Sequence, residues 1–508
     1  MAGGFRHPDV VVIGGGAIGL ASAWRLAQRG LAVTVVDPAP GSGASTVAAG
    51  LLAPVTEARL GEDDLLRLNV ASWARWPDFA AEVSTAAGVP IGYREDGTLL
   101  VALDADDRAV LDEGIACQRA LGLDVTPLRG REVRAAEPGL APGVRAGAMA
   151  AGERRVDTKA LVPALHRVAA AAGVTFVART AEQITMSPTG DRVAGVRLGA
   201  ATLRTSPSGR VATAVGADGV TAAARSATSV TASPLAAAGG TEEAVGSSES
   251  ADSARADRPA ADRGQDGVAV PVASVPADAI EPAAEGDVIE AGHVVLAAGC
   301  WSGQVAGVPD EARPPVRPVR GQVLVLRQPT DQPLLGRTVR ALVHGAHIYL
   351  APRDDGRVVV GATVEERGWD TRVTAGGTYE LLRDVVALVP GLDDAELVAV
   401  EAGLRPGSPD DVPIIGRSAV DGLTVATGHY RNGILLTPVT ADAVAAVVTG
   451  DPPPPEIAAC DPQRFAAGRS ASVVRSAAVA SSAPDSPATR AGPEVAPSAE
   501  VASGEVAP

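Results

Sequence analysis

The glycine-rich segment Gly14-Gly15-Gly16-Ala17-Ile18-Gly19 constrains the fold of this 508-residue chain more than any other feature. The residues before it, Asp9–Gly14, contain a continuous β-branched run that is typical of a parallel strand buried on both faces. The residues after it, Ala17–Arg29, carry apolar side chains at helical spacing, and Gly30 ends the predicted helix. Leu31–Val36 predicts a second buried strand. Strand, turn, helix and strand in this order favour an α/β domain with a parallel sheet.

Each glycine of this turn has its own physical role. Gly14 permits a tight turn, Gly16 lets the backbone approach a pyrophosphate, and Gly19 allows the helix to pack closely on the strand. The free N–H groups at the helix N-terminus attract phosphate charge. Asp37 follows the second strand, where a carboxylate can accept a hydrogen bond from a ribose hydroxyl.

The turn therefore predicts a dinucleotide site. An acid beside the ribose favours a free 2′-hydroxyl, so NAD or FAD is a better candidate than NADP. The fingerprint alone does not separate FAD from NAD. The alternative explanation is a glycine-rich loop in an unrelated α/β domain.

The rest of the chain continues the alternation of helices and strands. Periodicity predicts helices at Leu65–Ala87, Asp104–Leu121, Val156–Ala172, Tyr379–Leu388 and Asn432–Thr449, with Asp157 and Thr158 as candidate caps of the third. Strands are predicted twice within Pro90–Leu103 and at Val174–Val177, Arg192–Leu198, Val288–Ala298, Arg320–Arg327, His347–Pro352, Arg357–Ala362, Val398–Leu404 and Leu423–Ala426. The block of strands at about 316–400 predicts a second, more antiparallel sheet inserted into the first domain.

Two segments have a different composition. Residues 206–286 and 467–508 consist mainly of Ala, Ser, Gly, Asp, Glu and Pro, with few large apolar side chains. Such segments bury too little surface to offset their ordering entropy. We expect a disordered low-complexity insertion at 206–286 and a disordered tail at 467–508.

The overall charge and the cysteines exclude several classes of function. The net charge is −16, and an acidic surface repels nucleic acid and anionic membranes, so we expect neither as a partner. Cys117, Cys300 and Cys460 are far apart, which argues against a disulfide framework or a zinc site and favours a cytoplasmic protein. The six histidines are scattered, and we expect no bound metal.

The N-terminus shows no targeting pattern. The first ten residues lack the basic start and apolar core of a signal peptide. The apolar run Val10–Leu26 is interrupted by glycines and by Arg25, whereas a membrane span needs about 20 predominantly apolar residues.

Four later groups of residues extend the dinucleotide motif. Small and hydroxyl side chains follow the Asp37 strand in Ser45-Thr46-Val47-Ala48-Ala49-Gly50-Leu51-Leu52. Gly403-Leu404-Arg405-Pro406 and Pro413-Ile414-Ile415-Gly416 come late in the chain, before Gly428-His429-Tyr430-Arg431-Asn432-Gly433-Ile434-Leu435. Together, the four motifs resemble the D-amino acid oxidase superfamily and, within it, the glycine oxidase branch, the ThiO enzymes of thiamine synthesis. The resemblance covers nearly all of residues 9–450 outside the insertion.

The resemblance implies a p-hydroxybenzoate hydroxylase-like architecture, in which a Rossmann-type FAD-binding domain carries an inserted antiparallel-sheet substrate domain. On this basis the FAD domain comprises residues 1–85, 151–205, 287–315 and 401–466. The substrate domain comprises residues 86–150 and 316–400. The insertion at 206–286 is not part of the family pattern.

The resemblance also implies non-covalent FAD and gives its contacts residue by residue. The expected contacts are Gly14, Gly16, Ala17, Ile18, Gly19, Asp37, Pro38, Ala44, Ser45, Ala49, Gly50 and Leu51, the strand backbone near Glu182, and, along the flavin ring, His429, Tyr430, Arg431, Asn432, Gly433, Ile434 and Leu435. Asp37 stands where many relatives have Glu.

Four residues are expected to bind the substrate. Arg405, in a Gly- and Pro-rich turn after a strand, matches the family's carboxylate-binding arginine, whose planar fork suits two parallel hydrogen bonds. Arg431 matches a second substrate contact. His347 and Tyr349 share one face of a predicted strand and match two side chains of the substrate cavity. Val364 stands where some relatives have Met, which leaves side-chain selectivity open.

Each of these residues also has a structural alternative. Arg405 could be a surface arginine, Arg431 could pair with an acid on a loop, and Tyr349 could be a satisfied core tyrosine. Cys300 and Trp301, at the end of a strand near the cofactor, are expected to be packing residues, as are Trp73 and Trp76.

The sequence thus predicts FAD-dependent oxidative deamination of glycine and other small amines, with dioxygen as acceptor and a role in thiazole formation. No catalytic base is assigned, because the chemistry belongs to the cofactor. One alternative is a D-amino acid or sarcosine dehydrogenase or oxidase with another electron acceptor. Another is a flavin-binding scaffold without turnover. The sequence does not fix the oligomeric state, and a homo-oligomer stays open.

Overall fold

The computed structural model describes residues 7–199 and 283–465, and the statements below concern these ranges. Most of the predicted insertion and all of the predicted tail therefore lie outside the described residues. The last residues of the predicted insertion are described. The Gly286 N–H donates to the Leu198 carbonyl at 2.8 Å, so regular structure resumes slightly before the predicted boundary.

The first sheet has six strands in the order β18-β19-β12-β1-β2-β8. All neighbours are parallel except β18 and β19. The strands are β1 (Val10–Ile13), β2 (Val33–Val36), β8 (Thr175–Val177), β12 (His293–Leu296), β18 (Ile414–Arg417) and β19 (Leu423–Thr427). Segments from four distant parts of the chain thus meet in one sheet.

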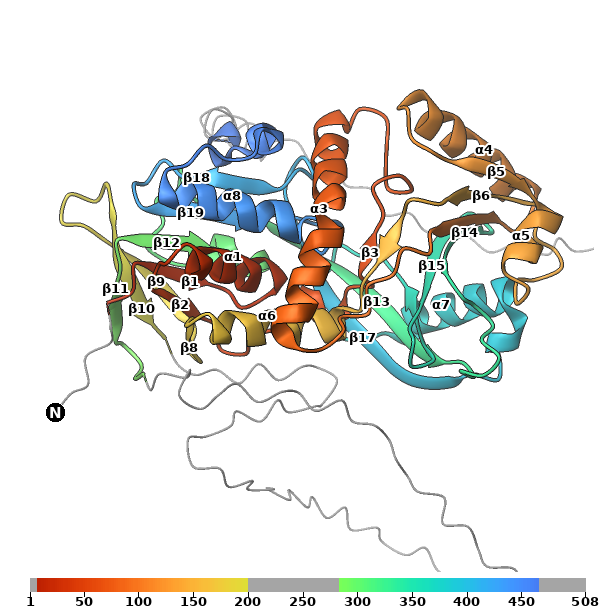
Figure 1. Cartoon of the computed structure of the whole chain (residues 1–508), viewed down its shortest axis with the longest axis horizontal. Coiled ribbons are helices and arrows are strands. Elements are labelled where there is room, and N and C mark those ends of the chain that lie inside the picture. The colour runs from red at the N-terminus through yellow and green to blue at the C-terminus, as the bar shows by residue number, and fades with distance from the viewer. Residues whose placement is uncertain (1–6, 200–282, 466–508) are drawn as a thin grey trace, which may run out of the picture. The chain divides into compact units, whose positions relative to one another are not determined.

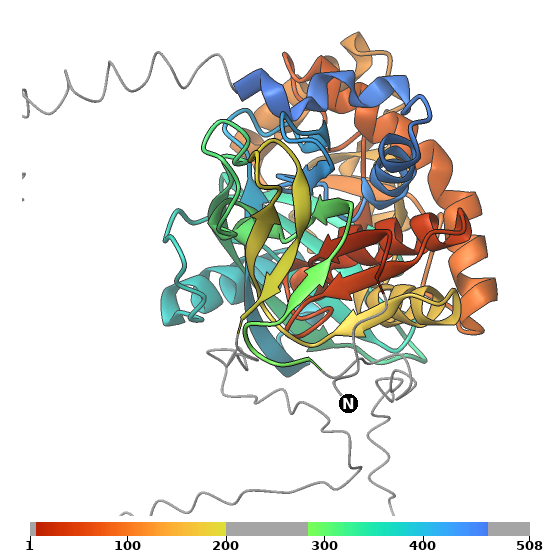
Figure 2. The ribbon, with the colours of Figure 1, turned by 90° about the vertical axis from the view of Figure 1, so that its left-hand side faces the viewer.

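Layers cover both faces of this sheet (Figures 1 and 2). One face packs against α1 (Ala17–Gln28), α3 (Asp63–Ala87), α6 (Thr158–Ala171) and α8 (Thr437–Thr449) through a core that contains Val10, Val12, Val33 and Val35. The other face packs against an antiparallel sheet of β9 (Ala181–Met186), β10 (Val193–Leu198) and β11 (Val288–Glu290). Because alternate side chains of β1 enter opposite cores, the strand is apolar throughout.

The second large sheet has eight strands in the order β17-β13-β16-β15-β14-β4-β6-β5. Every neighbouring pair is antiparallel except β14 and β4. The strands are β4 (Thr98–Ala102), β5 (Thr126–Arg129), β6 (Ala146–Ala150), β13 (Arg317–Arg327), β14 (Thr338–Val343), β15 (Ala346–Pro352), β16 (Arg357–Gly361) and β17 (Glu396–Gly407).

Helices pack on opposite faces of this sheet. α7 (Ala375–Leu388) covers one face through a core with Leu324, Val360 and Leu381. α4 (Ala105–Ala120) covers part of the other through Leu111 and Ile115. The remaining elements are α2 (Ala44–Val47), α5 (Gly130–Ala136), the two-stranded sheet of β3 (Leu51–Leu52) and β7 (Arg154–Arg155), and the 3-10 helices η2 (Gly299–Gln304), η3 (Pro390–Leu392), η4 (Pro455–Cys460) and η5 (Pro462–Phe465).

The predicted fold class, α/β with an inserted antiparallel-sheet domain, is confirmed. The predicted helices at 65–87, 104–121 and 156–172 are present within two residues, and Asp157 caps α6 by accepting from the Lys159 N–H at 2.9 Å. Thr158 is the first helical residue rather than a cap.

Several predicted boundaries are wrong. Pro90–Leu103 contains one strand, β4, and Val288–Ala298 contains two, β11 and β12. The last helix begins at Thr437 rather than Asn432, because most of residues 430–436 form turns. β5, β6, β9, β14 and α5 were not predicted, since each is short and lacks clear periodicity on its own.

Among the described residues, no helix combines the length and apolar character that crossing a bilayer requires.

Candidate active site

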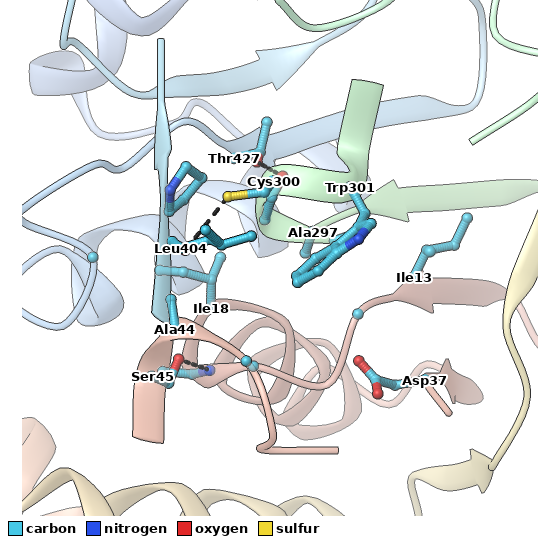
Figure 3. A pocket seen from close by; sticks show the side chains of 18 of the residues that line it. Ile13, Ile18, Asp37, Ala44, Ser45, Ala297, Cys300, Trp301, Leu404 and Thr427 are labelled. Carbon is cyan, nitrogen blue, oxygen red and sulfur yellow. Dashed lines mark hydrogen bonds between the residues drawn. The ribbon is translucent and has the colours of Figure 1, made fainter. Parts of the chain in front are cut away.

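The first cavity lies at the carboxyl ends of β1 and β2 and has a volume of about 420 Å³. Its walls come from the glycine-rich turn, from residues 36–48, from β9, from η2 and from residues 404–434. Figure 3 shows Asp37, Ala44 and Ser45 along one side, with Cys300, Leu404 and Thr427 on the other. An elongated molecule would therefore contact segments that are hundreds of residues apart in sequence.

The three glycines of the turn differ in what an added side chain would contact. A Cβ on Gly14 would overlap the Ala297 carbonyl, and one on Gly19 would overlap the Gly14 carbonyl, so both positions serve the packing of the protein itself. A Cβ on Gly16 would meet only the Ser45 Oγ, at 3.5 Å. Protein packing therefore leaves room for a side chain at Gly16, while a ligand at this cavity wall would not.

The N-terminus of α1 faces the same wall. Gly16 is the N-cap and gives no side-chain cap, and the Ala17 N–H donates to the Ser45 Oγ at 3.1 Å. Unfilled backbone donors at a helix N-terminus attract phosphate oxygens. The bare backbone at Gly16 and this helix end together fit the pyrophosphate of a dinucleotide.

Asp37 is anchored by the backbone. Its Oδ2 accepts from the Gly15 N–H at 2.7 Å and its Oδ1 from the Ala39 N–H at 2.8 Å. A carboxylate oxygen can accept more than one hydrogen bond. The Asp37 carboxylate is therefore held in place and can still accept a bond from a ribose hydroxyl. Pro38 and Glu182 line the same cavity.

A second cavity, of about 600 Å³, adjoins the first. Four residues line both cavities, namely Ala48, Arg405, Arg431 and Ile434. Arg405 and Arg431 therefore lie where a ligand in one cavity would meet a ligand in the other.

One face of the eight-stranded sheet forms the floor of the second cavity. In β17 and β13, Arg405 pairs with Val319 and Gly403 with Gly321. Across the following strands, Tyr349 pairs with both Gly361 and Arg340. Since alternate residues share a face, Arg405, Gly321, Gly361, Tyr349 and Arg340 all lie on this one face.

Two glycines of this face make room for the functional side chains. A Cβ on Gly321 would overlap the guanidinium of Arg405, and a Cβ on Gly361 would overlap the hydroxyl of Tyr349. The two glycines are diagonal neighbours in adjacent strands, because Gly361 pairs with Val323. The guanidinium and the phenol thus lie flat on the sheet, one beside the other.

The position of Arg405 corrects the prediction of a turn. The residue lies inside β17, because pairing with β13 continues to Gly407 and orders the Gly- and Pro-containing segment as strand. Its Nη1 donates to the carbonyls of Thr363 at 3.1 Å and Arg320 at 3.3 Å. Among the described residues, no carboxylate lies within 4 Å of this guanidinium.

A polar network holds those carbonyls in place. Glu365 accepts from Arg320, from Gln322 Nε2 at 2.7 Å and from Thr363 Oγ1 at 2.7 Å. Burial would raise the pKa of Glu365, but these three donors lower it to about 2. The carboxylate is therefore ionised, and it fixes the segment that carries the Thr363 carbonyl.

Arg431 differs from Arg405 because acids face it. Its guanidinium lies 3.8 Å from Glu57 and 3.9 Å from Glu62, and Arg340 also binds Glu57. Burial would raise the pKa of Glu57, but Arg340 and Arg431 together lower it below its ordinary value. The structural alternative for Arg431, an ion pair on a loop, is thus present, and the residue still lines both cavities.

Tyr349 and His347 line the second cavity, as their shared strand face predicts. Burial raises the pKa of Tyr349, while Arg405 and Arg340 oppose the shift. Burial and then Arg340 lower the pKa of His347. Both side chains are therefore neutral near pH 7.

The other predicted cofactor contacts fall into three groups. Gly14, Gly16, Ala17, Ile18, Asp37, Pro38, Ala44, Ser45, Glu182, His429, Tyr430, Arg431, Gly433 and Ile434 line the first cavity. Ala49, Gly50, Leu51 and Asn432 line the second. Gly19 and Leu435 line neither, and the Leu435 carbonyl accepts from Ser72 and from Trp76 Nε1 instead.

Two expected packing residues have a different position. Cys300 and Trp301 lie in η2 rather than at a strand end, and both line the first cavity (Figure 3). Trp301 also packs against Trp369 with ring centroids 5.5 Å apart. His429, in the same cavity, is buried, which lowers its pKa to about 3 and keeps the imidazole neutral.

Sequence reasoning missed the glycine floor, Glu57 and Arg340. Gly321 and Gly361 each fall inside a predicted strand, and a glycine there is a signal for close approach of another group. Glu57 and Arg340 carry no such local signal, because their pairing depends on the tertiary fold. Among the described residues, no group of three or more His, Cys, Asp or Glu side chains could hold a metal ion.

Comparison with known proteins gives the context of this geometry. A family model described as "FAD dependent oxidoreductase" matches residues 9–241 and 258–447. A glycine oxidase from Geobacillus kaustophilus is 30% identical over 87% of this chain and 92% of its own length. The bifunctional protein ThiO/ThiG of Synechocystis is 29% identical over 90% of this chain. This chain spans about half the length of that cyanobacterial protein (54%).

Solved structures agree with the sequence relatives. The crystal structure of glycine oxidase from Geobacillus kaustophilus superposes with a TM-score of 0.67 at 27% identity, covering 89% of this chain and 98% of the other. That of glycine oxidase from Bacillus cereus gives a TM-score of 0.64 at 25% identity, covering 87% and 97%.

Proposed function

Because the chain belongs to the FAD-dependent oxidoreductase family, we propose that it oxidises glycine and other small amino acids at the carbon–nitrogen bond. The overall reaction converts the amino acid, water and dioxygen into the 2-oxo acid, ammonia and hydrogen peroxide. For glycine the 2-oxo acid is glyoxylate. The similarity to glycine oxidases over most of the chain supports this substrate class.

We propose that the first cavity holds FAD without a covalent bond. The backbone at Gly16 and the N-terminus of α1 would receive the pyrophosphate, and Asp37 would bind the adenosine ribose. The segment His429–Ile434 would contact the flavin ring. The bare cavity wall at Gly16, which protein packing leaves free, supports this placement.

Arg405 is the single observation that carries the proposed substrate class. Its guanidinium lies on the sheet between the two cavities, is fixed by two backbone carbonyls and faces no carboxylate of the described residues. Arg405 is half-buried. A cation partly shielded from water with no carboxylate beside it is unfavourable, and a substrate carboxylate would neutralise it. The neighbouring arginines already face Glu57.

The side chains of this cavity bind and orient the substrate. Arg405 would accept the carboxylate in a bidentate pair, and Tyr349 would donate its hydroxyl to one of the same oxygens. Fixing the carboxylate places the α-carbon at the junction of the two cavities, which converts a bimolecular encounter into an oriented one. A bound FAD supplies the acceptor for the two electrons of the Cα–H bond, and dioxygen then takes them up as peroxide.

No general base is needed among the protein residues. The amine loses its proton before or during the oxidation, and water hydrolyses the imine that results. His347 is neutral near pH 7 and lies on the same face of the sheet as Tyr349. We give it no role in the reaction beyond lining the cavity.

We further propose that the imine or glyoxylate product supplies thiazole formation, as the resemblance to the ThiO enzymes of thiamine synthesis implies. The similarity to a protein named ThiO/ThiG supports this proposal. A cytoplasmic location and a homo-oligomer stay predictions from the sequence.

Two alternatives remain distinguishable. A D-amino acid or sarcosine dehydrogenase would keep the same cavities and pass electrons to a quinone or an electron-transfer protein. Rapid peroxide formation under air argues against it. A flavin-binding scaffold would bind FAD without turnover, and anaerobic bleaching of the flavin by an amino acid rules it out.

Substitution of Arg405 tests the proposal. In the FAD-loaded enzyme, Arg405→Ala should raise KM for glycine by about 100-fold or more, because a charge-assisted pair with the substrate carboxylate is lost. The flavin spectrum should stay unchanged. Arg405→Lys should recover part of the loss, since it restores charge without the planar fork.

Arg417→Ala is the matched control, because Arg417 also donates to a backbone carbonyl but lines neither cavity. Unchanged glycine kinetics in Arg405→Ala would remove Arg405 from the substrate site.

A further inference from the structure

The second cavity extends well beyond the residues that would bind glycine. Its floor continues from Tyr349 across Arg340 to Leu100, which pairs with Arg340 and lies on the same face. Neighbouring strands are about 4.8 Å apart, so Leu100 lies about 10 Å beyond Tyr349. A ligand anchored at Arg405 and Tyr349 could therefore reach across two further strands.

Helix α4 forms the wall at this far end. Val110, Leu111, Gly114, Ile115 and Gln118 line the cavity. Their spacing of i, i+1, i+4, i+5 and i+8 places them on one side of the helix. Leu111 and Ile115 belong to the core that joins α4 to the sheet, and Leu342 and Leu100 continue the apolar lining on the sheet side. The helix side of this end is thus apolar apart from Gln118, and on the sheet side Leu100 and Leu342 lie beside His347, whereas the Arg405 end is charged.

Gln118 is an exception within this apolar wall. Its side chain is 6% exposed, and its Oε1 is buried without a hydrogen-bond partner among the described residues. A buried amide oxygen without a donor is unfavourable, and native structures rarely leave one. In its present position this oxygen exposes almost no surface to the cavity, so a hydrogen-bond donor on a ligand would satisfy it only after the Gln118 side chain rotates.

Gly114 leaves space in the same wall. A Cβ on Gly114 would meet nothing within 4 Å, although the residue lines the cavity and lies in the middle of the helix. Glycine inside a helix is less favourable than alanine, so the position is not explained by helix stability. The missing side chain keeps the cavity open beside Ile115.

Glycine does not use this space. A cavity of about 600 Å³ has the size of sites that bury much larger ligands, and glycine has only five non-hydrogen atoms. The predicted FAD contacts that line this cavity, Ala49–Leu51, Asn432 and Ile434, lie on other segments than α4.

We propose that the α4 side of the second cavity is a distal substrate subsite, formed by Val110, Leu111, Gly114, Ile115 and Gln118. It takes an apolar extension of roughly six carbons that ends in a hydrogen-bond donor for Gln118. The substrate class is therefore a longer amino acid, substituted on its nitrogen or its α-carbon, with the carboxylate on Arg405. This inference rests on the proposed function, because the carboxylate anchor is the same.

The extension takes no part in the bonds that change. The Cα–H bond still supplies the two electrons and a hydrogen to FAD, and the nitrogen still loses a proton. Water adds to the resulting C=N bond and releases the amine, while dioxygen takes up the electrons as peroxide. A substituent on nitrogen leaves with the amine, and one on the α-carbon stays with the 2-oxo acid.

Binding of unreactive carboxylates tests the subsite without turnover. Calorimetric titration of the FAD-loaded protein should show octanoate binding at least about tenfold tighter than acetate, because the tail transfers from water to an apolar wall. 8-Hydroxyoctanoate should bind tighter still, since its hydroxyl meets Gln118. Gly114→Phe should fill the wall and abolish the advantage of octanoate while acetate affinity stays within about twofold.

Two variants separate the subsite from effects on folding. Ala116→Phe is the matched control, because Ala116 is exposed on the same helix and lines neither cavity, and it should behave as wild type. Gln118→Leu should keep octanoate affinity and remove the preference for the hydroxyl. Equal affinity for acetate and octanoate in the wild type, or an equal loss of both in Gly114→Phe, would overturn the proposal.

Turnover then identifies the position of the extension. We expect kcat/KM for N-hexylglycine or 2-aminooctanoate to exceed that for glycine, and the better of the two shows whether nitrogen or the α-carbon carries the chain. If carboxylates bind as expected but no amino acid reduces the flavin, the proposed reaction fails and the subsite stands. If glycine is oxidised and neither longer probe is, the proposed reaction stands and the substrate class fails.

Discussion

The two cavities that meet at Arg405 are built in opposite ways. The first combines backbone and small side chains of the glycine-rich turn and of residues 36–48, which are close together in sequence, with walls from β9, η2 and residues 404–434. The second is formed by side chains on the floor of a sheet whose strands come from residues 98–102 and 317–407. In the first cavity Gly16 leaves room for a ligand. In the second, Gly321 and Gly361 leave room for Arg405 and Tyr349.

This difference explains where selectivity resides. Backbone N–H groups recognise phosphate wherever a strand, turn and helix bring them together, so the first cavity says little about the reaction. The second cavity depends on which charges are paired. Arg340 and Arg431 face Glu57, whereas Arg405 faces backbone carbonyls. We therefore expect the substrate class to depend on this ion pairing and on the α4 wall.

The largest effect is expected in the first cavity. Gly16→Val should give a folded, colourless protein, because the added side chain enters space that protein packing leaves free and a ligand would need. The ratio of flavin absorbance to protein absorbance, together with the circular dichroism spectrum, measures this outcome. The exposed Gly143, whose Cβ would also meet nothing, provides the control Gly143→Val. A normal flavin content in Gly16→Val would show that the pyrophosphate lies elsewhere.

A smaller effect is expected in the second cavity. Gly321→Ala should displace the guanidinium of Arg405 and raise KM for glycine by about 10- to 100-fold, the range for a hydrogen-bonded charge of 1.5–3 kcal/mol, while FAD content stays normal. Steady-state kinetics of the FAD-loaded enzyme give the measurement. Gly376→Ala, at an open position on α7, should leave KM unchanged. If Gly321→Ala binds glycine normally, the guanidinium does not need the floor that Gly321 provides.

The smallest effect concerns the support behind Arg405 and depends on pH. The pKa of Glu365 is about 2, below its ordinary value of 4.5, so its stabilisation is fully present above pH 4.5 and is lost as pH falls toward 2. Glu365→Gln should therefore lower the free energy of unfolding by about 2 kcal/mol at pH 7, and by much less near pH 3.

Urea unfolding at the two pH values measures this difference. Glu366→Gln is the neighbouring control, since Glu366 forms only an exposed ion pair with Arg317, 3.3 Å away. A destabilisation by Glu365→Gln that is equal at pH 7 and pH 3 would show that the ionised carboxylate is not what holds this segment.

Predictability from sequence follows the same division. The elements of the first domain were predicted because apolar periodicity and the glycine-rich turn are local signals. The position of Arg405 was predicted as a turn, because Gly403, Pro406 and Gly407 usually interrupt a strand. Pairing with all of β13 keeps these residues in the sheet, and that pairing cannot be read from residues 403–407 alone.

The glycine-rich turn, the acid after the second strand and the later motifs were determined by the sequence, because each acts through backbone conformation within a few residues. They establish the family and a dinucleotide site. Only the tertiary structure decided which arginine faces no acid, which glycines lie beneath the substrate residues, and that α4 bounds the second cavity. These features depend on strand register and on ion pairs between segments hundreds of residues apart, such as those of Glu57 with Arg340 and Arg431, and no local pattern encodes such pairs.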